Sequence, residues 1–134
     1  MNKIRMKPPI FVYEPVDLNV FQSVETAQSW LEPIDVESGI YAAFDSEGKK
    51  LNVKVIKSKE VAGRWLFFFK KYYTEKIIIE ESGEQFPEEL KRILVEFLSD
   101  PQIIKTQGVT IDFLKNCSLP DLVVRALPFK SRFN

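Results

Sequence analysis

The stretch from Val20 to Leu51 constrains the fold of this 134-residue chain more than any other, because helix, break, strand and turn signals follow one another within it. Ser23 is a typical N-cap residue, and apolar residues follow it at helical spacing. Pro33 disfavours helix at the residue before it, Glu32. We therefore predict a short helix that starts at Ser23 and ends at Leu31.

A β-hairpin is predicted after this helix. Residues 40–45 are rich in apolar and aromatic side chains, and Ser46-Glu47-Gly48 after them is a turn signal. Apolar and polar residues then alternate over 51–57, which is typical of a half-buried strand. The pattern indicates two antiparallel strands over 40–45 and 51–57.

The rest of the chain adds further strands and helices. Strands are predicted over 10–13, 64–69 and 74–81, and the aromatic run within 65–73 is also compatible with a buried helix. Pro87 begins the clearest helix, which ends at Leu98 and carries an apolar stripe. Two short helices are expected over 110–116 and 121–127.

These elements predict one α+β domain over residues 1–134, with an antiparallel sheet of about four or five strands and packed helices. Residues 1–9 and 129–134 are expected to be loose termini. The 87–98 helix should pack one face on the sheet through Leu90, Ile93, Leu94 and Phe97.

Composition narrows the chemistry. The chain has no histidine and a single cysteine, Cys117. Catalytic triads of the Ser-His or Cys-His type are therefore excluded, a zinc site has no support, and an intramolecular disulfide cannot form. We expect no catalysis, no metal and no cofactor, and a cytoplasmic location. An enzyme that uses paired carboxylates, either Asp35 with Glu37 or Asp45 with Glu47, stays open as an alternative.

Charge is segregated along the chain although the net charge is zero. Residues 11–50 and 79–100 are acidic, and residues 51–78 are basic. The acidic segments are either ordinary solvated faces or one patch that attracts a basic partner. The segment Lys54–Lys76 interleaves basic and aromatic residues, so it is either a strand with an aromatic inner face or a small nucleic-acid-binding surface.

The chain resembles small bacterial immunity proteins, which are encoded beside polymorphic toxins such as those of contact-dependent growth inhibition and Rhs systems. The resemblance covers roughly the first 57 residues and, more loosely, the Pro87 helix. Five segments carry the resemblance. They are an extended start at Ile10–Tyr13, a lead-in at Asp17–Phe21, a helix entry at Ser23-Val24-Glu25, a helix exit at Leu31–Val36, and a strand with its turn at Tyr41–Gly48.

The resemblance implies a non-enzymatic antitoxin that binds and blocks the C-terminal domain of one cognate toxin. Many such toxins are nucleases with basic surfaces, which an acidic inhibitor face would complement. We therefore place the toxin-binding surface on the acidic and aromatic residues between the first helix and the hairpin turn, namely Trp30, Glu32, Asp35, Glu37, Tyr41, Asp45 and Glu47.

Overall fold

The computed structural model describes residues 6–15, 17–60 and 72–129. Within these residues, five strands form one antiparallel sheet in the order β2-β1-β3-β4-β5. The strands are β1 (Ile10–Glu14), β2 (Asp17–Phe21), β3 (Ala42–Phe44), β4 (Lys49–Glu60) and β5 (Tyr72–Gln85). The predicted α+β class and antiparallel sheet are confirmed.

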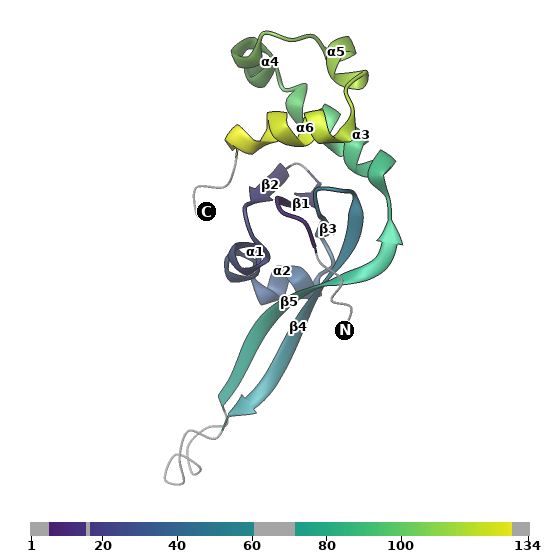
Figure 1. Ribbon diagram of the computed structural model, residues 1–134. Coiled ribbons are helices and arrows are strands. Elements are labelled where there is room, and N and C mark those ends of the chain that lie inside the picture. The colour runs from purple at the N-terminus through teal and green to yellow at the C-terminus, as the bar shows by residue number, and fades with distance from the viewer. Residues whose placement is uncertain (1–5, 16, 61–71, 130–134) are drawn as a thin grey trace.

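Helices cover both faces of the sheet (Figure 1). Between β2 and β3 lie α1 (Val24–Trp30) and α2 (Pro33–Glu37). After β5 the chain forms α3 (Pro87–Leu98), α4 (Pro101–Gln107), α5 (Ile111–Lys115), α6 (Leu119–Ala126) and a short 3-10 turn, η2 (Leu127–Phe129). The sheet is therefore the middle layer, with α1 and α2 on one face and α3, α5 and α6 on the other.

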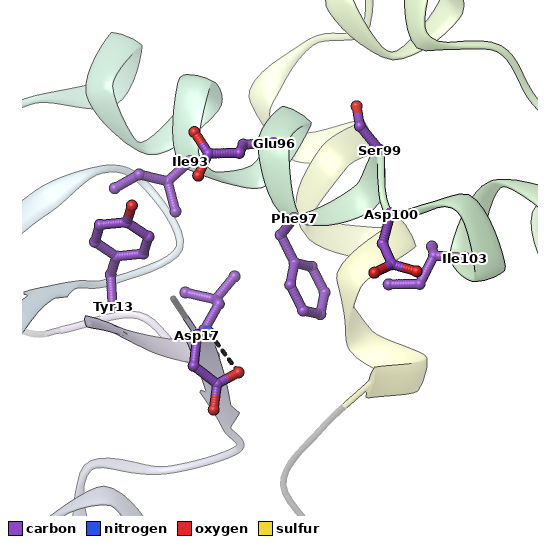
Figure 2. Close-up of a pocket in the computed structure, with 9 residues that line it drawn as sticks. Tyr13, Asp17, Ile93, Glu96, Phe97, Ser99, Asp100 and Ile103 are labelled. Atoms are coloured by element: carbon purple, nitrogen blue, oxygen red, sulfur yellow. Dashed lines mark hydrogen bonds between the residues drawn. The ribbon is translucent and has the colours of Figure 1, made fainter. Parts of the chain in front are cut away.

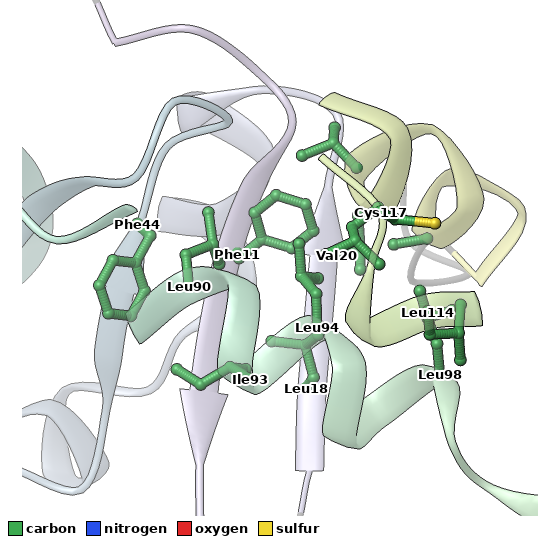
Figure 3. Close-up of a cluster of buried hydrophobic side chains, with 13 residues drawn as sticks. Phe11, Leu18, Val20, Phe44, Leu90, Ile93, Leu94, Leu98, Leu114 and Cys117 are labelled. Atoms are coloured by element: carbon green, nitrogen blue, oxygen red, sulfur yellow. The ribbon is translucent and has the colours of Figure 1, made fainter. Parts of the chain in front are cut away.

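Alternation along β1 creates two cores, one on each face. Phe11 points to the α3 side, where fully buried leucines of α3, α5 and α6 pack against it (Figure 3). Ile10 and Val12 point to the opposite side, where Ala27 and Leu31 cover them. We call these the α3 core and the α1 core.

The predicted helices are confirmed with small shifts. Ser23 caps α1, and its Oγ accepts a hydrogen bond from the Thr26 N–H at 3.0 Å. The helix predicted over 87–98 has the same bounds as α3. Thr110 caps α5, and α6 begins at Leu119, two residues before the expected start.

The predicted strands are confirmed where they can be compared. Those over 10–13, 40–45, 51–57 and 74–81 correspond to β1, the shorter β3, β4 and the longer β5. The strand expected over 64–69 falls outside the described residues.

Most residues of the termini expected to be loose, 1–9 and 129–134, lie outside the described part of the chain, and two described residues at their inner ends contact the rest of the fold. The Lys7 backbone N–H donates to Asp45 Oδ2 at 3.1 Å, and the Lys7 carbonyl accepts from the Ser46 N–H at 2.9 Å. Phe129 packs its ring edge-on against Phe97, with 5.8 Å between ring centroids. Both contacts bridge segments that are distant in sequence, so local composition does not reveal them.

Candidate functional site

A hollow of about 550 Å³ lies between the end of α1, the start of α2 and the residue before β3. Its lining residues are Ser29, Trp30, Glu32, Asp35 and Tyr41. Four of these belong to the surface predicted from the sequence. We call this site the α1–α2 hollow.

Local sequence explains why these side chains meet. Trp30 is the last residue of α1, and the chain becomes extended at Leu31 before Pro33 starts α2. Asp35 therefore lies in the first turn of a second short helix, directly after the turn that carries Glu32. The break that proline imposes folds two acidic residues back beside the tryptophan.

The aromatic part of the hollow is anchored in the α1 core. Trp30 is half-buried and packs against the buried Phe21 ring, with 5.4 Å between ring centroids and an interplanar angle of 52°. This packing limits the rotamers open to Trp30, so the surface it presents is partly pre-organised.

The acidic part of the hollow acts on Tyr41. The Tyr41 hydroxyl donates to Asp35 Oδ2 at 3.4 Å, a long hydrogen bond. Burial, followed by the negative charges of Asp35 and Glu14, raises the pKa of the Tyr41 phenol to about 12. The lining contains the carboxylates of Glu32 and Asp35 and no basic residue, so its formal charge is negative.

Large apolar side chains lie beside these residues in sequence. Ile34, in α2, is 74% exposed, and Ile40 is 39% exposed. Val36 instead packs against the α1 core, so the two sides of this short helix differ. An exposed isoleucine next to two carboxylates and two aromatic rings has the composition of an interaction surface.

Asp45 does not belong to this surface, although the sequence placed it there. It is completely buried, and its carboxylate accepts hydrogen bonds from the backbone N–H groups of Lys7, Glu47 and Lys49 at 2.9–3.1 Å. A carboxylate committed to three backbone donors holds the turn together. Asp45 therefore stabilises the turn before β4 and is not available to a partner.

Glu47 and Glu37 lie outside the hollow as well. The Glu47 carboxylate contacts Lys7 Nζ at 3.0 Å and Lys49 Nζ at 3.8 Å. The hydrogen bond from Lys7 lowers the pKa of Glu47. Glu37 is exposed at the end of α2 and is not among the lining residues.

A second acidic hollow, of about 350 Å³, lies where the β1–β2 end of the sheet faces α3 and α4 (Figure 2). Its polar lining includes Tyr13, Asp17, Glu96 and Asp100, and Phe97 forms an apolar wall. Sequence reasoning missed this α3–α4 hollow as a site. The acidic segment 79–100 was the available signal, but it does not reveal that Glu96 and Asp100 meet Asp17.

The described residues limit the chemistry of these hollows. Among them, no group of three or more histidine, cysteine, aspartate or glutamate side chains could hold a metal ion. The Cys117 thiol is buried and donates to the Phe113 carbonyl at 3.3 Å, away from both hollows. What the α1–α2 hollow offers is negative charge next to aromatic rings, which suits a cationic group.

Comparisons of the chain with protein-family models, with curated proteins and with solved structures find no match. None of the helices in the described part of the chain has both the length and the apolar character needed to cross a bilayer.

Proposed function

We propose that this chain is a cytoplasmic immunity protein that binds the C-terminal domain of a cognate toxin of the nuclease class. It neutralises the toxin by stoichiometric inhibition. The observation that carries the proposal is the α1–α2 hollow, in which Trp30, Glu32, Asp35 and Tyr41 come together without a basic residue in the lining. The resemblance of the first part of the chain to immunity proteins points the same way.

The charge of the hollow fits a partner that binds nucleic acid. A nuclease grips phosphates with lysine and arginine, so its functional surface is basic. Acidic side chains that face such a surface speed the encounter and disfavour neutral or acidic partners. Half-buried aromatic residues such as Trp30 and Tyr41 supply the contact energy that charge alone does not.

The test uses the gene beside the one that encodes this chain. If that gene encodes a secreted protein, its C-terminal domain is expressed with and without this chain, and growth and nuclease activity are measured. We expect the domain to arrest growth, this chain to restore it, and titration calorimetry to give a one-to-one complex. Growth arrest that this chain does not relieve would contradict the proposal.

Charge reversal then locates the interface. One double variant carries Glu32→Lys and Asp35→Lys at the start of α2. The control double variant carries Glu88→Lys and Glu89→Lys, in the first turn of α3, which also starts with a proline. We expect the first pair to slow association about tenfold or more, with a weaker dependence on salt, and the second pair to have a small effect. The reverse order would move the interface to the acidic face of α3.

Two other functions were open from the sequence. In the described part of the basic stretch, Lys54 is paired with Glu80 at 2.9 Å, which reduces its availability to a phosphate. Among the four carboxylates considered for acid–base catalysis, Asp45 is held by backbone donors, Glu47 by lysines, and Asp35 accepts the Tyr41 hydroxyl. No observation on the described residues favours either alternative over the binding of a basic protein.

A further inference from the structure

We propose that the α1–α2 hollow receives one arginine side chain of the bound protein. Its guanidinium would contact the rings of Trp30 and Tyr41 and pair with the Asp35 carboxylate. The inference rests on the proposed function for the identity of the partner, but the chemistry of the hollow can be tested without that partner.

Negative potential in the hollow is the first argument for a cation. Asp35, Glu14 and Glu32 all contribute to the raised pKa of Tyr41, with burial as the largest cause. Burial disfavours any charge at this point, but the Coulombic part of the shift comes from carboxylates, which favour a positive group there. Since the lining includes no lysine or arginine, a positive group in the hollow would come from another molecule.

The mixture of rings and carboxylates argues for arginine over lysine. A guanidinium is planar, stacks on aromatic faces and donates two parallel hydrogen bonds to one carboxylate. It is also less strongly hydrated than an ammonium group, so it costs less to bring beside half-buried rings. Trp30, fixed against Phe21, is a suitable stacking surface.

Exposed apolar residues argue that the cation belongs to a protein. Ile34 is 74% exposed and lies next to Asp35 in the chain, and Ile40 is 39% exposed and lies next to Tyr41. A free cation would leave both side chains in water. Neither side chain lines the hollow itself, so only a partner whose surface extends beyond its arginine would reach them.

The experiment titrates the isolated protein with three small probes and follows its amide and indole signals by nuclear magnetic resonance. The probes are the N-acetyl amides of arginine, of lysine and of citrulline, the neutral isostere of arginine. We expect the arginine probe to give saturable shifts at Trp30 and over residues 29–41, with a dissociation constant in the millimolar range. The lysine probe should bind more weakly, and the citrulline probe should cause no saturable shift.

Two variants make the assignment specific. Asp35→Asn should weaken the binding of the arginine probe about tenfold, because it removes the charge-assisted hydrogen bond. Glu89→Gln, an exposed carboxylate on α3, removes the same charge elsewhere and should leave binding unchanged.

Each contrary outcome overturns the inference. Equal shifts with citrulline would mean that the hollow does not recognise charge, and equal affinity for the lysine probe would remove arginine as the preferred group. Shifts absent from residues 29–41 would place any cation elsewhere. Circular dichroism checks that Asp35→Asn is folded, and wild-type titrations decide the matter if it is not. If the protein neutralises a toxin but does not bind the arginine probe, the proposed function stands and only the arginine inference is refuted.

Discussion

Tyr41 reports the electrostatic environment of the α1–α2 hollow through its own hydroxyl group. The phenol is neutral when protonated, so burial and nearby carboxylates both favour the protonated form. Together they raise the pKa of Tyr41 from its ordinary value near 10 to about 12, with burial as the larger cause. The ionisation of Tyr41, followed by spectroscopy, therefore reports on the burial and the charges in the hollow.

We predict that Asp35→Asn lowers the pKa of Tyr41 toward 10 without reaching it, because the burial remains. The folded pKa lies above the unfolded one, so the contribution of Tyr41 to stability is full below about pH 10 and is lost as the pH rises through about 12. The measurement is an ultraviolet titration of tyrosinate, from which the titration of Tyr41→Phe is subtracted to isolate the signal of Tyr41. It is limited to pH values at which circular dichroism reports folded protein. An unchanged titration in Asp35→Asn would contradict the proximity of the two groups.

Asp35 and Asp45 show how far residue-level prediction reaches. In the sequence both are acidic residues near a helix end or turn, and both were assigned to one surface. Asp45 is instead enclosed by backbone N–H groups, one of which comes from Lys7, far away in the sequence. Asp35 stays partly exposed beside Tyr41. The number of backbone donors around each carboxylate depends on tertiary contacts, which no local pattern encodes.

Gly48 links two secondary-structure elements that are far apart in the chain. It lies in the turn between β3 and β4 with a φ angle of +82°, and its carbonyl accepts a hydrogen bond from the Phe86 N–H at 2.8 Å. A Cβ atom at this position would lie 2.4 Å from Pro87 Cα, at the start of α3. Both the backbone conformation and the lack of a side chain are therefore required.

We predict that Gly48→Ala destabilises the protein by several kcal/mol, because α3 would have to move away from the turn. Gly83→Ala is a matched control, since Gly83 has a φ of +85° and no atom within 4 Å of an added Cβ. The control should cost only about 1–2 kcal/mol, for the left-handed conformation. Urea unfolding of both variants measures the difference, and equal losses would show that the clash with Pro87 is relieved at no cost.

At the level of elements, prediction succeeded where a periodic apolar stripe was long. The helix over 87–98 has such a stripe and a proline at its first position. The elements missed were β2, α2 and α4. The Asp100 side chain accepts a hydrogen bond from the Gln102 N–H and caps α4 only two residues after α3 ends at Leu98. A helix that starts so soon after another is hard to separate from it by sequence pattern.

The hollow itself was predicted only in part, for a similar reason. Four lining residues were identified because acidic and aromatic types cluster over 30–41. Their convergence depends on α2, whose five residues are too few to display helical periodicity. The α3–α4 hollow needs residues of β1 and β2 to meet residues of α3 and α4. Such contacts follow from the packing of layers and not from spacing along the chain.

On the scale of the whole molecule, α3 joins the sheet to the remaining helices. Its leucines and isoleucine are fully buried in the α3 core, whereas Phe97, which we expected on the sheet, is only partly buried. Phe97 instead lines the α3–α4 hollow and packs against Phe129. Phe97 lies three positions after Leu94, but the next residue, Leu98, occupies the buried face of α3 instead of Phe97.

We therefore predict unequal costs for two truncations in one helix. Leu94→Ala should lower the free energy of unfolding by about 3–4 kcal/mol, because it leaves a cavity where α3 meets the sheet. Phe97→Ala should cost less, about 1–2 kcal/mol, since its site is already open to solvent. Denaturant unfolding of the two variants provides the comparison. A larger loss for Phe97→Ala would contradict the prediction and mean that the Phe97 side chain stabilises the protein more than that of Leu94.

The two-sided sheet has a consequence for synthesis on the ribosome. Phe11 and Phe44 are made before the side chains that cover them, which belong to α3, α5 and α6. At a typical elongation rate, roughly ten seconds separate Phe11 from the end of α6. The opposite face, by contrast, receives α1 soon after β1 and β2. A growing chain would thus expose one apolar face of its sheet until α3, α5 and α6 have been made, and that face is where a chaperone would first engage it.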